Sequence, residues 1–153
     1  MSVKAERFIA LAREDAAKST LAYKHGCLAT LGGKIIARGC NTDRSYHGSR
    51  TMNCMNTTHA EINVCRMLEA KFKRNPRKLH KVILYIARAD RHGGCELFQS
   101  APCRDCSRRI KELNIKRVVY SCEDKRIESC STVDYHSNHI SYGNRYLNNI
   151  LAQ

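Results

Sequence analysis

The apolar positions of the first forty residues follow a helical period and then form two short runs. Between residues 4 and 20 they recur at the spacing of one helix face: Phe8, Ile9, Leu11, Ala12 and Ala16. Residues 27–31 and 34–38 are β-prone runs joined by Gly32-Gly33, and glycine takes a positive φ without strain. The pattern predicts a helix followed by a β-hairpin.

Polar and apolar segments alternate through the middle of the chain. Residues 39–58 are rich in Asn, Ser, Thr and Arg, which predicts a loop. Thr57 or Thr58 then provides an N-cap for a helix over residues 59–73. Residues 82–87 form a continuous apolar run, which is typical of a strand that is covered on both faces.

The remaining pattern completes an α/β arrangement. A polar segment over residues 88–99 precedes a helix that starts near Pro102, and residues 115–121 predict a further strand. A short strand over residues 131–135 and a helix over residues 146–151 are expected after it. The order of elements predicts an α/β fold in which one mixed sheet lies between helices, a three-layer α/β/α sandwich.

Length and hydropathy limit the classes of protein. The chain has 153 residues, the usual size of one domain, so we expect a single domain over residues 1–153. No run approaches the roughly 20 apolar residues that span a bilayer, and the N-terminal apolar run contains charges, unlike a signal peptide. We expect a cytoplasmic or otherwise intracellular protein that does not bind membranes.

Cysteine count and net charge are both unusual. Nine cysteines, an odd number without an export signal, favour metal ligands and small buried side chains over a disulfide framework. The net charge is +13, and residues 71–118 carry fourteen Lys or Arg against four Asp or Glu. This basic region makes phosphate-bearing partners plausible, and nucleic acid is one candidate.

Two short motifs place metal ligands at the starts of two predicted helices. His59 and Glu61 open one helix, and Cys103 and Cys106 open the helix after Pro102. The helix dipole favours thiolates at an N-terminus, and thiolates bind zinc. One histidine and two cysteines leave a fourth tetrahedral position for water, as in catalytic zinc sites. Glu61 is then placed to exchange protons with that water.

Other interpretations of these residues stay open. Cys95 or His92 could complete a structural zinc site with four protein ligands. His136 and His139 lie in a short polar segment that we interpret as an exposed loop and not as a second metal site. The combination of His-x-Glu with Pro-Cys-x-x-Cys is nevertheless that of zinc-dependent nucleobase deaminases.

The chain resembles the cytidine and deoxycytidylate deaminase superfamily over residues 26–121. The resemblance rests on the sequences Gly39-Cys40-Asn41, His59-Ala60-Glu61-Ile62-Asn63, Ala101-Pro102-Cys103-Arg104-Asp105-Cys106 and Ile115-Lys116-Arg117-Val118-Val119-Tyr120-Ser121. It implies a five-stranded mixed sheet with helices on both faces. It also implies hydrolytic deamination, a Zn²⁺ cofactor, and assembly into a homo-oligomer.

The resemblance further implies roles for individual residues. His59, Cys103 and Cys106 would hold the zinc ion, and Glu61 would be the general acid/base. Asn41 would contact the sugar, and the main chain of three residues would contact the base edge: Ala60, Ser100 and Ala101. The loop over residues 42–58, with Arg44 and Arg50 within it, is predicted to form a wall of the substrate pocket and to read a phosphate.

The substrate is the least determined property. The absence of Trp and the compact C-terminal part favour a small substrate, a cytosine nucleotide or nucleoside, with dCMP first. The alternative is a deaminase of cytosine or adenine within RNA or single-stranded DNA, which the basic run over residues 71–81 supports. A zinc-stabilised nucleic-acid-binding module without activity is the third possibility, and the intact Glu61 argues against it.

Overall fold

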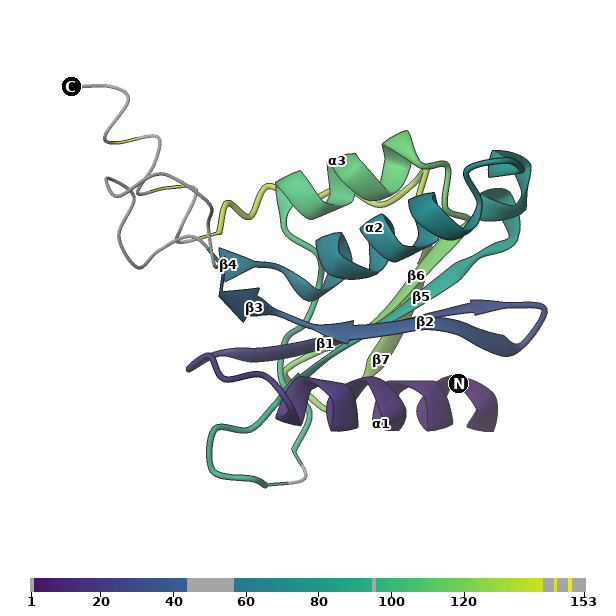
Figure 1. The fold of residues 1–153 in the computed structure, drawn as a ribbon. Helices are drawn as coiled ribbons and strands as arrows, with labels where there is room; N and C mark the ends of the chain where they lie inside the picture. Colours follow the sequence, from purple (N-terminus) through teal and green to yellow (C-terminus); the bar gives the residue numbers. More distant parts are fainter. Residues whose placement is uncertain (1, 44–56, 95, 142–144, 146–148, 150–153) are drawn as a thin grey trace.

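A five-stranded mixed sheet forms the centre of the computed structural model, which describes residues 2–43, 57–94, 96–141, 145 and 149 (Figure 1). The strands of this sheet are β1 Lys24–Leu31, β2 Lys34–Cys40, β5 Ile83–Ala89, β6 Arg117–Ser121 and β7 Ile127–Ser131. Their order is β2-β1-β5-β6-β7, in which β5 and β6 are parallel and the other neighbours antiparallel. The predicted five-stranded mixed sheet is confirmed.

Helices cover both faces of the sheet, as predicted. Helix α1 Val3–Ala17 lies on one face, against β1 and β5. Helices α2 Ala60–Lys71 and α3 Arg104–Glu112 lie together on the other face, above the sheet in Figure 1. A 3-10 helix, η1 Pro76–Lys81, leads from α2 into β5. Among the described residues no helix combines the length and apolarity needed to cross a bilayer.

The alternation of side chains along the strands creates one apolar core on each face. Leu28 of β1 and Tyr85 of β5 point to α1, where Phe8 packs against the Tyr85 ring with centroids 4.9 Å apart. Their neighbours Cys27 and Leu84 point the opposite way, toward α2 and α3. A strand that is buried on both faces needs apolar residues at every position, which explains the continuous apolar run of β5.

Two glycine positions shape the β1–β2 half of the sheet. Gly32 and Gly33 have φ values of 57° and 79°, so the predicted hairpin turn is confirmed. Gly26 serves a different purpose, because α1 crosses directly over it. A Cβ atom there would lie 1.9 Å from the carbonyl oxygen of Ala12 and 2.6 Å from the nitrogen of Ala16. Only glycine lets the helix backbone approach β1 so closely.

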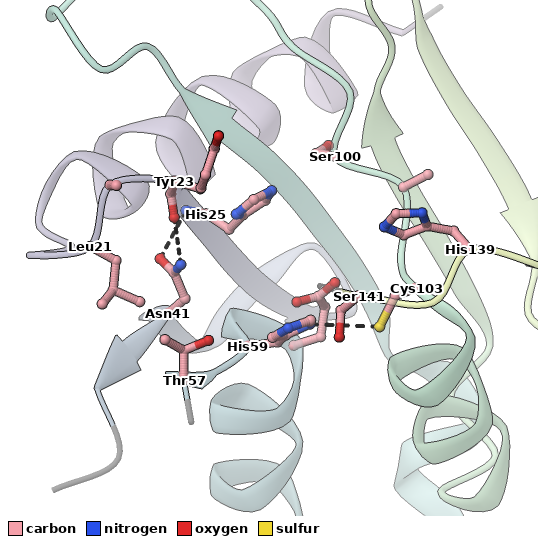
Figure 2. A pocket seen from close by; sticks show the side chains of 13 residues that line it. Leu21, Tyr23, His25, Asn41, Thr57, His59, Ser100, Cys103, His139 and Ser141 are labelled. Carbon is pink, nitrogen blue, oxygen red and sulfur yellow. Dashed lines mark hydrogen bonds between the residues drawn. The ribbon is translucent and has the colours of Figure 1, made fainter. Parts of the chain in front are cut away.

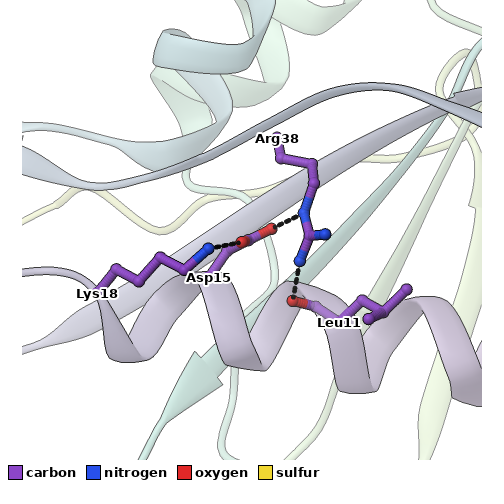
Figure 3. A network of polar contacts seen from close by, with 4 residues as sticks. All are labelled: Leu11, Asp15, Lys18 and Arg38. Atoms are coloured by element: carbon purple, nitrogen blue, oxygen red, sulfur yellow. Dashed lines mark hydrogen bonds and ion pairs between the residues drawn. The ribbon is translucent and has the colours of Figure 1, made fainter.

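An ion-pair network ties the C-terminal half of α1 to β2 (Figure 3). The Asp15 side chain is only 4% exposed and accepts hydrogen bonds from Arg38 Nε at 2.7 Å and Lys18 Nζ at 3.0 Å. Arg38 also donates to the carbonyl oxygen of Leu11 at 3.5 Å. The buried carboxylate is therefore compensated from two elements, which holds the helix over the hairpin.

The helix cap predicted at Thr57 or Thr58 is wrong. These residues form strand β4 Thr57–Thr58, which pairs with β3 Thr42–Asp43, so the predicted loop contains a short two-stranded ladder. The N-cap of α2 is His59, whose side chain makes no capping hydrogen bond. Because α2 begins at Ala60, the N-cap position falls on His59, and the two threonines belong to the strand ladder that precedes it.

The strand predicted over residues 131–135 is also wrong. The strand is β7 Ile127–Ser131, and the backbone turns after it, since Asp134 and Tyr135 donate to the carbonyl oxygen of Ser131. The tight turn after β6, with Lys125 at φ 64°, starts the return strand at Ile127. The helix predicted over residues 146–151 lies outside the described ranges, apart from residue 149.

Replacing Gly26 with alanine tests the close approach of α1 to β1. Overpacking against helix backbone costs about 1–3 kcal/mol, so Gly26→Ala should lower the free energy of unfolding by that amount. Chemical denaturation measures it, with Gly39→Ala as the matched control. A Cβ at Gly39 would meet the Val64 side chain at 3.5 Å, an ordinary contact. Equal stability of the two variants would contradict this account of Gly26.

Candidate functional site

Two helix N-termini meet at one end of the sheet and bring the predicted metal ligands together (Figures 1 and 2). His59 is the N-cap of α2, Cys103 is the N-cap of α3, and Cys106 lies in the first turn of α3. Neither N-cap residue uses its side chain to cap its own helix. Their side chains instead face each other across the gap between the helices.

The distances within this cluster suit a zinc ion. His59 Nδ1 lies 3.6 Å from Cys103 Sγ and 3.3 Å from Cys106 Sγ, and the three ligand atoms lie within 4.8 Å of one another. Nitrogen and sulfur ligands at ~2.0 and ~2.3 Å in tetrahedral geometry stand about 3.6 Å apart. One imidazole and two thiols are also the donor types that zinc prefers, so the residues present fit this metal.

The three ligands perturb one another's pKa values. Hydrogen bonding with Cys106, with a further contribution from His59, lowers the pKa of Cys103 to about 4. The same interaction, together with burial, raises the pKa of the Cys106 thiol. The pKa of His59 is raised to about 9, chiefly by its hydrogen bond with Cys103. The lowered pKa favours the thiolate form of Cys103, which is the form that binds a metal cation.

Glu61 stands beside the ligands without belonging to the three-ligand group. It lies in the first turn of α2, is only 5% exposed and lines the pocket. Burial raises the pKa of its carboxyl group, and the nearby His59 opposes that shift. A carboxyl group with a raised pKa can exchange protons near neutral pH, as a general acid/base must.

A pocket of about 540 Å³ opens onto the cluster, a volume usual for small-molecule sites. Its walls come from the α1–β1 connection, the starts of β1 and β4, the residue after β2, the starts of α2 and α3 with the residues before α3, and the segment after β7. The lining residues are Leu21, Ala22, Tyr23, His25, Asn41, Thr57, His59, Glu61, Ser100, Ala101, Cys103, His139 and Ser141. Figure 2 shows Tyr23, His25 and Asn41 on one side and Cys103 and His139 on the other.

Asn41 lies in the pocket wall, and its side-chain amide is held by the backbone of the neighbouring segment. Its Nδ2 donates to the carbonyl oxygen of Tyr23 at 2.6 Å, and its Oδ1 accepts from the nitrogen of His25 at 2.9 Å. Its own carbonyl oxygen accepts from the Ser19 hydroxyl at 2.8 Å. The amide orientation is therefore fixed before any ligand enters.

The three residues predicted to offer main-chain groups lie around the same pocket. Ser100 and Ala101 line it, and Ala60 is fully buried between the two pocket residues His59 and Glu61. The Ser100 nitrogen already donates to the carbonyl oxygen of Ser121 at 2.9 Å. The Ser100 hydroxyl donates to the carbonyl oxygen of Ile86 at 2.7 Å. The N–H group and the hydroxyl of Ser100 are therefore already used within the protein.

The remaining predicted residues fall into two groups. Arg44, Arg50 and Cys95 fall outside the described residues. His92, offered as a fourth ligand, is exposed in the turn after β5, and within the described part of the chain the metal-binding group contains only His59, Cys103 and Cys106. The described residues therefore supply three ligands, as a catalytic site requires.

The sequence analysis missed several residues that line the pocket. His25 is the most informative, because a histidine directly before the apolar part of a strand is a signal that could have been noticed. Burial, and secondly the charge of Arg88, lower the pKa of His25 to about 4. The His25 imidazole is therefore neutral at neutral pH. Tyr23 and Ser141 gave no such signal.

The segment after β7 reaches the pocket through two anchors at the start of α3. The Tyr135 hydroxyl donates to the carbonyl oxygen of Pro102 at 2.7 Å, and the Arg104 nitrogen donates to that of His139 at 2.8 Å. His139 is exposed, as expected, but it also lines the pocket. The interpretation of this segment as only an exposed loop is therefore incomplete.

Solved structures share this fold. A cytidine deaminase from Burkholderia pseudomallei has a TM-score of 0.63 at 18% identity, over 92% of this chain and 100% of that one. The dCMP deaminase of cyanophage S-TIM5 in its apo form has a TM-score of 0.56 at 24% identity, over 80% and 86% of the two chains. The same phage enzyme in complex with dCMP and dUMP has a TM-score of 0.51 at 20% identity, over 80% and 84%. These similarities show the fold.

A family model adds information from the sequence. No curated protein matches the chain. The model of the cytidine and deoxycytidylate deaminase zinc-binding region matches residues 2–122. This range includes both motifs and all four ligand or acid/base candidates: His59, Glu61, Cys103 and Cys106. With this match over most of its length, the chain belongs to the cytidine and deoxycytidylate deaminase family of zinc-dependent hydrolytic deaminases.

Proposed function

We propose that the protein deaminates a cytosine nucleotide or nucleoside by zinc-dependent hydrolysis, with dCMP as the favoured substrate. The observation that carries the proposal is the position of Glu61. Its buried carboxyl group lines the pocket beside three metal ligands. A site that served only to stabilise the fold would gain nothing from a buried carboxyl group in an open pocket.

The cofactor in this proposal is Zn²⁺ held by His59, Cys103 and Cys106. Zinc in a site with three protein ligands supplies an activated water for attack on the carbon that bears the amino group. The helix N-termini contribute to binding, because their unpaired backbone N–H groups favour the thiolate form of the cysteines.

Glu61 moves the protons. Hydrolytic deamination requires a proton to leave the attacking water and another to reach the departing amino group. The Glu61 carboxylate accepts the first proton, and its raised pKa lets it hold that proton until the amine leaves as ammonia. Because the side chain is buried, bulk water does not compete for the proton.

The other walls of the pocket bind the nucleotide. We assign Asn41 to the sugar, since its amide is already oriented by two backbone hydrogen bonds. The main chain of Ala60, Ser100 and Ala101 is assigned to the base edge. The phage dCMP deaminase whose complex contains dCMP and dUMP shares this fold, which supports a nucleotide as the substrate class.

A base within a nucleic acid is the second candidate substrate. The basic run over residues 71–81 supports it, because all six of its Lys and Arg residues are exposed. It lies at the C-terminal end of α2, whereas His59 lies at the other end. A helix of 12 residues is about 18 Å long, so this run would contact a strand well away from the reacting base.

We also propose that the protein is a homo-oligomer. The pocket is open at its rim, and the family resemblance includes neighbouring chains that help to close it. In an oligomer, residues of a neighbouring chain would cover the open rim of the pocket.

Metal analysis tests the ligand assignment. The wild-type protein should contain about one zinc per chain, and Cys103→Ala should lose most of it because a three-ligand site does not survive on two. Cys130→Ala is the matched control, since Cys130 is half-buried on β7 and lies outside the cluster. Full zinc occupancy in Cys103→Ala would reject the assignment.

A substrate panel tests the reaction and the role of Glu61. The zinc-loaded protein is incubated with cytidine, deoxycytidine, CMP, dCMP and a single-stranded oligonucleotide, and ammonia release is measured. We expect the fastest release from dCMP. Glu61→Gln should retain zinc and fold but lose about 10²–10⁴-fold in turnover, because it removes the proton carrier alone.

Glu69→Gln is the control for that variant. Glu69 lies two turns further along α2, is 39% exposed and pairs with Arg109. It should keep turnover close to that of the wild type. If Glu61→Gln stays as active as Glu69→Gln, another residue carries the proton. If the oligonucleotide is the only substrate that releases ammonia, a base within a nucleic acid replaces the free nucleotide as the proposed substrate.

Selectivity for phosphate tests Arg44 and Arg50. A charge-assisted hydrogen bond to phosphate contributes roughly 1.5–3 kcal/mol, so removing the arginine concerned should reduce the preference for dCMP over deoxycytidine by about tenfold to a hundredfold. The measurement is kcat/KM on both substrates for Arg44→Ala and Arg50→Ala. An unchanged preference in both variants would exclude this loop as the phosphate-binding wall.

A further inference from the structure

Four side chains form an arginine–aromatic cluster beside the pocket. The guanidinium carbon of Arg88 lies 5.1 Å from the ring centroid of Tyr23 and 5.5 Å from that of Phe98. The guanidinium carbon of Arg91 lies 5.2 Å from the Tyr23 centroid. We call Tyr23, Arg88, Arg91 and Phe98 the basic rim.

The basic rim adjoins the pocket on the side of Asn41. Tyr23 lines the pocket and accepts the Asn41 amide at its carbonyl oxygen, and Figure 2 shows the two residues next to each other. Arg88 is paired in register with His25, another pocket residue, across the β1–β5 ladder. The basic rim therefore adjoins the pocket wall that contains Asn41.

The nearby acidic side chains do not neutralise these two arginines. Asp90 accepts hydrogen bonds from the nitrogens of His92 and Gly94 within its own turn, and Glu96 pairs with Lys125 at 3.8 Å. Within the described ranges no ion pair involves Arg88 or Arg91. Arg91 donates through Nε to the carbonyl oxygen of Ala22 at 3.2 Å, which positions its side chain but leaves its charge.

The positive charge of Arg88 affects a residue that lines the pocket. Burial and then Arg88 lower the pKa of His25, so the cation acts on a group in the pocket wall. A guanidinium that lies over an aromatic ring keeps N–H donors along its edge, where phosphate oxygens bind in pairs. The aromatic rings also limit the freedom of the arginine side chains, so less entropy is lost when an anion binds.

We propose that the basic rim binds the phosphate group of the substrate nucleotide, with Arg88 and Arg91 as donors in addition to any arginine of the loop over residues 42–58. This inference rests on the proposed function, because it assumes that the sugar lies at Asn41. The phosphate has two possible sources: a free nucleoside monophosphate, or the backbone of a single strand whose base enters the pocket. The chemistry of recognition is the same for both.

Binding of reaction products tests the proposal without turnover. Calorimetry on the zinc-loaded protein gives Kd for deoxyuridine, dUMP and a single-stranded oligonucleotide that contains one deoxyuridine. The proteins are wild type, Arg88→Gln, Arg91→Gln, Arg91→Lys and Arg7→Gln. Arg7 is exposed on α1, so its variant removes one positive charge away from the basic rim.

The wild type should prefer dUMP to deoxyuridine. Arg88→Gln and Arg91→Gln should each reduce that preference by about tenfold to a hundredfold, while Arg91→Lys keeps part of it and Arg7→Gln all of it. Deoxyuridine lacks a phosphate, so its Kd should stay nearly constant. If the arginines only packed the loop, the affinities for deoxyuridine and dUMP would fall together, and that result would overturn the proposal.

The oligonucleotide distinguishes the two sources. In one outcome, the variants lose affinity for the oligonucleotide but keep their affinity for dUMP, and the salt dependence of oligonucleotide binding falls by about one phosphate contact. The phosphate then belongs to a strand. In another outcome, the preference for dUMP over deoxyuridine and the Kd for the oligonucleotide are the same in the wild type and all variants. That result would reject phosphate binding by the basic rim, and turnover of dCMP would still support the proposed function. Binding of inorganic phosphate that depends on both arginines, without any deamination of cytosine substrates, would keep the basic rim and reject the proposed function.

Discussion

The site depends on the side-by-side packing of two helices that start at the same end of the sheet. Helix α3 lies in the connection between the parallel strands β5 and β6, on the face that α2 already covers. Their N-caps, His59 and Cys103, therefore stand opposite each other. Because neither side chain is used for capping, both are available to a metal ion, and the helix dipoles favour the thiolate ligands.

The polar side chains around the pocket are oriented by backbone groups before a ligand binds. Asn41 is held by the α1–β1 connection and the start of β1, and the Ser100 hydroxyl by β5. Among the described residues no buried side-chain nitrogen or oxygen lacks a hydrogen-bond partner. Such preorganisation lowers the entropic cost of binding, since these side chains do not have to be ordered by the substrate. Glu61 combines burial with a place in the pocket wall, which suits the proton-transfer role proposed for it.

Two groups of cations in the chain differ in their surroundings. One group of cations is the exposed run over residues 71–81, at the C-terminal end of α2, where cations also complement the helix dipole. The other is the basic rim next to the pocket, where Arg88 and Arg91 stack on aromatic rings. The two groups therefore differ in position, since the second adjoins the pocket and the first lies at the far end of α2.

The sequence alone determined the layer order, the hairpin at Gly32-Gly33 and the three candidate metal ligands that the structure brings together, because these follow from local periodicity and motif spacing. Tertiary structure decided what depends on contacts between distant segments. Thr57 and Thr58 pair with β3 and so do not cap α2, and the turn after β6 sets β7 earlier than its composition suggests. Likewise, the location of His25 in the pocket and the stacking of Arg88 on Tyr23 follow from the pairing of β1 with β5, which no local pattern encodes.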